Sequence, residues 1–285
     1  MAPFFSTRDC NRRVSNTEFR YSRCGRCGLV SLMNVPDDLA PFYTGEYHTL
    51  PQSDAEIERG AEHDRYKIEL VRRYVSGGRL LEIGPSWGGF CLLAKRAGFE
   101  VEAIEMDARC CEFLETRIGV RAIRANDEAA ALARASVPDA ITLWHTLEHL
   151  RDPWTLLARA AEQLAPGGVI VIATPNPAAL QFKALGRLWA HVDAPRHLHL
   201  LPAAMLRERM RALGLGEELC TTRDPGSLGW NAFGWSWSFA NQVTPRIMKR
   251  ALRLSGRVLA KIISPIEGRE GLGSAYTAVY RKPAS

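Results

Sequence analysis

The stretch Leu80-Leu81-Glu82-Ile83-Gly84-Pro85-Ser86-Trp87-Gly88-Gly89-Phe90 decides the fold of this chain. Its first residues, from 79 to 83, form a short apolar strand, and the glycines that follow predict a tight turn into a helix over 89–97. Further short apolar segments alternate with helical patterns along the chain. These segments are 100–105, 120–124, 140–145 and 169–174. Such alternation predicts an α/β fold, with a parallel sheet covered by helices on both faces.

Composition and charge exclude several classes of protein. The chain has 285 residues, of which 46% are hydrophobic and 24% are charged, as in ordinary globular proteins. The net charge of +6 is concentrated at the two ends, because residues 1–30 are basic and residues 244–263 contain six Lys or Arg and no acid. The region between them is acidic. We therefore expect no nucleic-acid partner.

The glycine-rich turn predicts a nucleoside ligand without phosphates. No Lys or Arg lies between Gly84 and Leu93, and Ser86 stands where a dinucleotide-binding turn would have its second glycine. Glu82 ends the first strand, and Glu105 ends the second, where a carboxylate can accept hydrogen bonds from ribose hydroxyls. Two carboxylates suit a ribonucleoside that carries an ammonium group, such as S-adenosylmethionine. The alternative is that both acids merely end surface strands.

Four ordered motifs carry a family resemblance. The turn at 82–89, Ile104-Glu105-Met106-Asp107, the segment 140–153 and Leu164-Ala165-Pro166-Gly167-Gly168 resemble the motifs of class I S-adenosylmethionine-dependent methyltransferases. The resemblance covers residues 60–215. It implies a Rossmann-like seven-stranded methyltransferase sheet with an antiparallel last strand, near 275–280. The cofactor-binding residues that it implies are Glu82, Gly84, Pro85, Trp87, Gly88, Glu105, Met106, Asn126 and Trp144. Asp127 is the alternative to Asn126 for a hydrogen bond from the adenine amino group.

The end of the strand at 140–145 supplies the candidate reaction centre, His145, Glu148 and His149. Methyl transfer to oxygen requires removal of a proton, and histidine is the usual base. Three interpretations stay open: a histidine base for an alcohol or phenol, a divalent metal that holds a catechol or vicinal diol, or a structural loop. Quinone-biosynthesis O-methyltransferases have a similar Glu-His motif, although His145 stands where those enzymes tend to have a carboxylate.

An insertion over 175–201 is expected to cover the acceptor site. His197 is a candidate catalytic residue, and Asp193 and Arg196 are candidates for binding an anionic or hydroxylated substrate. The alternative is that Asp193 and Arg196 form a structural turn.

Residues 1–50 resemble a degenerate zinc ribbon. Cys24 and Cys27 have zinc-ligand spacing, Cys10 lies upstream, and His48 or Asp9 could complete a site for structural zinc. Residues 51–75 are expected to form a linking helix before a methyltransferase domain at 76–285. The odd number of cysteines and the lack of a secretory signal predict reduced thiols and a cytoplasmic location.

The segment 229–266 combines five aromatic residues with a basic amphipathic helix over 244–263. One interpretation is peripheral contact with the inner face of a membrane. The other is that the apolar face of the helix packs on the core. No apolar run is long enough to span a bilayer.

The sequence therefore predicts a methyltransferase that uses S-adenosylmethionine and acts on a small-molecule acceptor, at a hydroxyl oxygen. Candidate acceptors are a phenol or quinone precursor, or a sugar of a glycolipid or secondary metabolite. The alternatives are a C- or N-methyltransferase on a nucleotide sugar or natural product, an RNA methyltransferase, and a cofactor-binding scaffold without chemistry.

Overall fold

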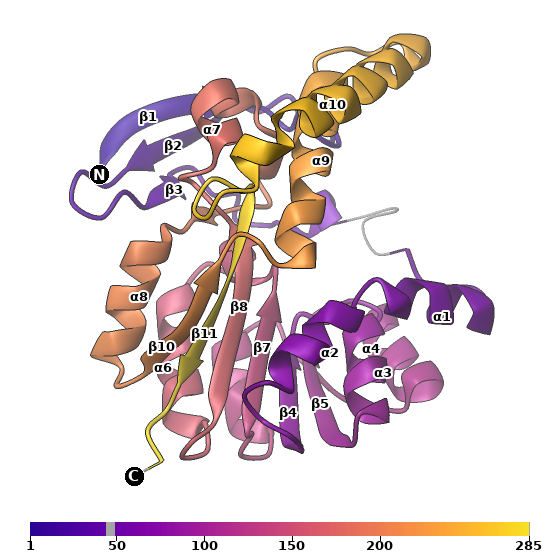
Figure 1. Cartoon of the computed structure of the whole chain (residues 1–285), viewed down its shortest axis with the longest axis vertical. Coiled ribbons are helices and arrows are strands. Elements are labelled where there is room, and N and C mark those ends of the chain that lie inside the picture. The colour runs from indigo at the N-terminus through magenta and orange to yellow at the C-terminus, as the bar shows by residue number, and fades with distance from the viewer. Residues whose placement is uncertain (44–48, 285) are drawn as a thin grey trace.

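A seven-stranded sheet forms the centre of the computed structural model, which describes residues 1–43 and 49–284 (Figure 1). The strand order is β10-β11-β8-β7-β4-β5-β6. The strands are β4 (Gly78–Ile83), β5 (Phe99–Glu105), β6 (Arg121–Arg124), β7 (Ala140–Trp144), β8 (Val169–Pro175), β10 (Gly216–Thr221) and β11 (Ala275–Arg281). β11 pairs antiparallel with both β8 and β10, and all other pairs in this sheet are parallel, so the predicted fold class is confirmed.

Helices cover both faces of this sheet because successive strand residues point to opposite sides. In β4, Leu80 packs in one buried cluster and Leu81 in the other. One face is covered by α1 (Asp54–Glu62), α2 (Arg65–Val71), α3 (Gly89–Arg96) and α4 (Ala108–Phe113). The other is covered by α5 (Glu128–Ala131), α6 (Pro153–Gln163) and α8 (Ala203–Ala212). The expected linking helix is thus two helices, α1 and α2.

The N-terminal segment forms a second, antiparallel sheet of order β1-β2-β3-β9. Its strands are β1 (Ala2–Thr7), β2 (Phe19–Arg23), β3 (Val30–Leu32) and β9 (His199–Leu200). Because β9 belongs to the insertion after β8, the N-terminal segment and the insertion share one buried cluster, which includes Phe19, Tyr21 and Leu200. Sequence analysis did not predict this pairing. The insertion also contains the short helix α7 (Leu180–Leu185).

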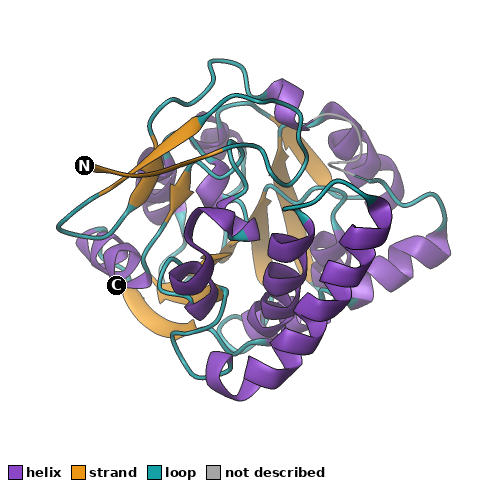
Figure 2. Ribbon diagram, turned by 90° about the horizontal axis from the view of Figure 1, so that it is seen from above, coloured by secondary structure: helices purple, strands orange, loops and turns teal. Residues whose placement is uncertain are grey.

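Two long helices, α9 (Pro225–Ala240) and α10 (Arg246–Glu267), lie between β10 and β11 in the chain. They pack together beyond the carboxyl ends of the parallel strands, as Figures 1 and 2 show. The crossing needs Gly256, since a Cβ atom there would lie 2.6 Å from the Cα of Ser236. Within the described residues, no helix is both long enough and apolar enough to cross a membrane.

Candidate active site

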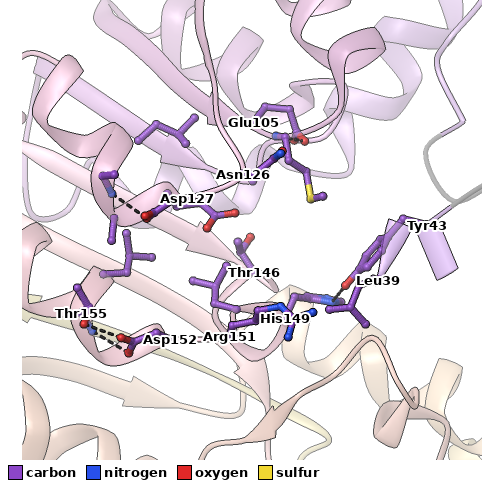
Figure 3. A pocket seen from close by; sticks show the side chains of 18 of the residues that line it. Leu39, Tyr43, Glu105, Asn126, Asp127, Thr146, His149, Arg151, Asp152 and Thr155 are labelled. Carbon is purple, nitrogen blue, oxygen red and sulfur yellow. Dashed lines mark hydrogen bonds between the residues drawn. The ribbon is translucent and has the colours of Figure 1, made fainter. Parts of the chain in front are cut away.

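A cavity of about 730 Å³ lies at the carboxyl ends of β4, β5, β6 and β7 (Figure 3). Ligands bind at this edge in open α/β sheets. The cavity brings together six of the predicted site residues: Gly84, Glu105, Met106, Asn126, His145 and His149. Predicted cofactor residues and predicted catalytic residues therefore share one space.

The turn after β4 requires glycine at position 84. This residue has φ of +72°, and a Cβ atom would lie 2.7 Å from the side chain of Thr146. The Thr146 hydroxyl in turn donates to the Ile83 carbonyl at 3.1 Å. Ser86, where the family has a glycine, also adopts a left-handed φ of 55°. The left-handed conformation of Ser86 therefore costs free energy, which the rest of the turn has to offset.

Glu105 connects this turn to the end of β5 through hydrogen bonds. Its carboxylate accepts hydrogen bonds from the backbone N–H groups of Ser86 at 3.0 Å, Met106 at 2.7 Å and Asp107 at 2.9 Å. Burial nevertheless raises the pKa of Glu105 above its ordinary value. A carboxylate has about four acceptor positions, so Glu105 can still accept a hydrogen bond from a ribose hydroxyl.

Five predicted cofactor residues do not line the cavity: Glu82, Pro85, Trp87, Gly88 and Trp144. Glu82 is buried and accepts a hydrogen bond from the Cys91 thiol at 2.9 Å. Burial raises the pKa of Glu82 to about 7, although the nearby charge of Lys67 opposes this shift. In the structure Glu82 therefore contacts α3 and does not reach the cavity.

His145 and Glu148 form the centre of the candidate catalytic group. His145 has a left-handed φ of 56°, and its Nδ1 lies 3.5 Å from Oε1 of Glu148, longer than a good hydrogen bond. Glu148 is fully buried, and its Oε2 accepts from the Thr174 hydroxyl at 3.0 Å. Burial alone would raise the pKa of Glu148, but His145 and the neighbouring imidazoles outweigh it and lower the pKa to about 2. Glu148 is therefore a buried carboxylate.

Two further histidines, His149 and His197, stack edge to face with ring centroids 4.6 Å apart. Nδ1 of His149 lies 3.1 Å from the Arg196 carbonyl, and Nδ1 of His197 lies 2.7 Å from the His191 carbonyl. A carbonyl only accepts, so each Nδ1 carries the hydrogen and each Nε2 keeps a lone pair when the ring is neutral. Burial lowers the pKa of His149 to about 4, which keeps it neutral at pH 7.

Glu148, His149 and His197 each offer one ligand atom, and these atoms lie within 4.8 Å of one another. Oε1 of Glu148 has no hydrogen-bond partner among the described residues, as expected of an atom that could bind an ion. A carboxylate and two imidazoles suit a divalent cation such as zinc or iron. The predicted trio, His145, Glu148 and His149, is thus replaced as a ligand set by one that includes His197.

The predicted zinc site at Cys10, Cys24 and Cys27 is not supported. Within residues 1–43 and 49–284, Glu148, His149 and His197 are the only three ligand side chains that cluster closely enough to hold an ion. Asp9, a possible fourth ligand, is occupied by an ion pair with Arg196 at 2.6 Å. The other possible ligand, His48, lies outside the described residues.

Asp193 and Arg196, the predicted substrate-binding residues, do not line the cavity. Arg196 is fully buried, and it pairs with Asp193 at 2.8 Å as well as with Asp9. The Arg196 guanidinium outweighs the effect of burial and lowers the pKa of Asp193. Arg196 thus bridges two carboxylates, one in the N-terminal segment and one in the insertion, which supports the structural interpretation.

The cavity also has a wall that sequence analysis missed, the segment 37–43. Arg151 holds this wall in place by donating hydrogen bonds to the carbonyls of Pro36 and Asp37. Tyr43 contacts the reaction centre, because its hydroxyl lies 3.0 Å from Nδ1 of His149. Asp127, the alternative to Asn126, also lines the cavity, and other lining residues that were missed are Glu128, Thr146, Asp152, Thr155 and Arg159.

Comparison with known proteins agrees with the fold. A family model described as a methyltransferase domain matches residues 59–216, more than half of the chain. A ubiquinone biosynthesis O-methyltransferase of Saccharophagus degradans is 29% identical over 161 residues, covering 52% of this chain and 68% of the relative. One of Caulobacter sp. (strain K31) is 27% identical over 169 residues, covering 57% of this chain and 67% of the relative.

The fold is also similar to that of a solved S-adenosylmethionine-dependent methyltransferase from Archaeoglobus fulgidus. The TM-score is 0.53 and the sequence identity 20%, over 79% of this chain and 94% of that chain. Together with the family match, the ordered motifs and the sheet topology, this likeness leads to one conclusion. The chain belongs to the class I S-adenosylmethionine-dependent methyltransferases.

Proposed function

We propose that this enzyme transfers the methyl group to a hydroxyl oxygen of a small molecule, a phenol or quinone precursor or a sugar. One observation carries the proposal: Gly84, Glu105 and Asn126 line the same cavity as His145 and His149. The sulfonium of the cofactor is already activated, so the protein has mainly to align the acceptor and exclude water. An oxygen acceptor also needs a base, which the histidines offer.

His145 is the candidate general base in this proposal. The buried Glu148 carboxylate lies beside its Nδ1, and a carboxylate there stabilises the imidazolium that forms when the ring takes a proton. His149 is a weak base because its pKa is about 4, so its role is to position the acceptor hydroxyl. The relatives named as ubiquinone biosynthesis O-methyltransferases support oxygen as the acceptor atom.

A second candidate mechanism uses a divalent metal. Glu148, His149 and His197 would hold the ion, and their clustering is the observation that favours this mechanism. When bound, the ion would lower the pKa of a coordinated catechol or diol hydroxyl. In this case His145 would orient Glu148, and Tyr43 would hold the His149 ring.

The test is a methylation assay with methyl-labelled S-adenosylmethionine and a matched set of acceptors: a catechol, a simple phenol, a glycoside, an aromatic amine and RNA. Products are analysed by NMR to identify the methylated atom. The proposal predicts a label on oxygen and dependence on His145. A label on nitrogen or carbon, or incorporation into RNA alone, would select an alternative function.

A further inference from the structure

Helix α10 exposes an apolar stripe along its length. Ile247, Leu254, Val258, Ile262 and Ile266 follow one another at intervals of seven or four residues, which places them on one face of the helix. Ile247 is 83% exposed, Leu254 63% and Ile262 69%. A surface helix normally turns a polar face to solvent, and a contiguous exposed apolar patch marks an interaction site. The exposed stripe therefore indicates a surface that binds a partner.

A row of cations borders this stripe. At 100° per residue, Arg246, Arg250, Arg257 and Lys261 fall on one side of the apolar face. None of them makes an ion pair within the described residues. The one acid of the helix, Glu267, is buried and accepts hydrogen bonds from Gln181 and Trp235. All the charges that α10 exposes are thus positive.

The opposite face of α10 holds the helix against the protein. Gly256 and Ala260 are buried there, and Gly256 allows the close approach to α9. The Arg253 guanidinium lies over the ring of Trp237, 4.2 Å from its centre. The apolar stripe consequently faces away from α9 and is exposed. Helix α10 itself lies at the edge of the molecule (Figure 1). The sequence-based alternative, in which the stripe packs on the core, is wrong for Ile247, Leu254, Val258 and Ile262.

We propose that α10 docks on the surface of an anionic lipid bilayer, with its apolar stripe among the acyl chains and its cations at the headgroups. This combination of faces is typical of helices that lie in the membrane interface. A second copy of the chain suits the stripe less well, because pairing two such helices would bring two cationic rows together. Anionic headgroups supply the opposite charge.

The docking helix is linked to the candidate active site. Helix α9 connects the two regions: its Trp230 ring lies 4.8 Å from the His145 ring, and its Trp237 contacts α10. The docking itself does not depend on which atom is methylated.

The test is flotation of the full-length protein with vesicles of phosphatidylcholine alone or of equal parts phosphatidylcholine and phosphatidylglycerol. One variant, Leu254→Ser/Val258→Ser/Ile262→Ser, removes the stripe. A second, Arg250→Glu/Arg257→Glu, reverses two cations. The control, Arg72→Glu/Arg73→Glu, makes the same change of net charge at exposed residues near the end of α2. All four proteins must bind S-adenosylhomocysteine equally well, which shows that they are folded.

We expect the wild type and the control to float with the anionic vesicles, and both α10 variants to bind them about tenfold more weakly or worse. Raised salt should weaken binding of the wild type. Anionic-vesicle binding that survives both α10 changes would overturn the proposal. So would light scattering that shows a dimer which dissociates in the stripe variant while no vesicle binds, since a second copy would then cover the stripe.

Discussion

Nδ1 of His145 lies 3.5 Å from Oε1 of the fully buried Glu148, at the point where β7 ends. The contact requires His145 to adopt a left-handed backbone conformation, which costs an ordinary residue about 1–2 kcal/mol. Strain of this kind is stored at functional sites and is offset by the surrounding packing. Here it places an imidazole on the cavity wall with a carboxylate next to it.

Replacing His145 should reduce methyl transfer without loss of cofactor binding. His145→Asn is the sharpest variant, because asparagine tolerates the left-handed conformation. We expect kcat to fall by about 10²- to 10⁴-fold, the usual contribution of a general base. Calorimetric titration with S-adenosylhomocysteine is the control and should give an unchanged Kd. A parallel loss of cofactor affinity would remove His145 from the role of base.

The stability of the fold should depend on pH through His191. Burial lowers the pKa of His191 from 6.5 to about 3. The unfolded chain takes up a proton near pH 6.5 while the folded chain does not, so His191 destabilises the fold progressively as the pH falls from 6.5 toward 3. At pH 4 the resulting loss in the free energy of unfolding is roughly 3 kcal/mol.

His191→Phe should remove this pH dependence while keeping a ring among Trp189, Trp230 and Phe233. Urea unfolding at pH 7 and pH 4.5 measures the effect, and the variant should lose less stability than the wild type between them. Equal losses in both proteins would show that His191 does not contribute.

The turn after β4 should be more stable with glycine at position 86. Ser86 has φ of 55°, so Ser86→Gly relieves a cost of about 1 kcal/mol, part of which is lost to the greater freedom of glycine in the unfolded chain. We expect a small rise in Tm and retained activity. The opposite variant, Gly84→Ala, places a methyl group against Thr146 and should lower both Tm and cofactor affinity. A fall in Tm for Ser86→Gly would contradict this account.

The sheet could be predicted from the sequence because its signals are local. Each strand is a short apolar run, and each turn or helix start has its own glycine, proline or capping residue. The meeting of Gly84, Glu105 and Asn126 in one cavity could be predicted for the same reason, since these residues end or follow successive strands. Their convergence results from the parallel topology alone.

The missed features depend on contacts between distant residues. Arg196 looks like a substrate ligand in the sequence, because Asp9, the acid that neutralises it, lies 187 positions away. The wall at 37–43 was missed for the same reason, because Arg151, which is distant in the sequence, holds it in place. Helix α9 is a different case: its glycines and aromatics lower helix propensity, but Asp224-Pro225 is a helix-start signal that could have revealed it. Asp224 is the N-cap residue of α9, and its side chain accepts a hydrogen bond from the backbone N–H of Ser227 at 3.1 Å.

Removing Arg196 should destabilise the fold strongly, because it leaves the carboxylates of Asp9 and Asp193 buried without a cation. We expect Arg196→Met to cost about 3–5 kcal/mol in urea unfolding. The matched control is Arg207→Met, which breaks an ion pair with Glu217 in which half of the arginine side chain is exposed and should cost under about 1 kcal/mol. A variant of Arg196 with unchanged stability and a raised KM for the acceptor would instead restore its role in substrate binding.

Metal analysis separates the two mechanisms proposed for the site. If Glu148, His149 and His197 hold an ion, protein dialysed against zinc or manganese should retain about one equivalent, the stoichiometry of a three-ligand site. His197→Gln removes one ligand and should abolish retention, whereas His63→Gln changes an exposed histidine at the end of α1 and should not. Retention is measured by elemental analysis, independently of turnover. If the wild type retains no metal and a chelator leaves its activity unchanged, the metal is not required. His145 with Glu148 must then provide the base, and the buried Oε1 of Glu148 serves only the imidazolium that forms beside it.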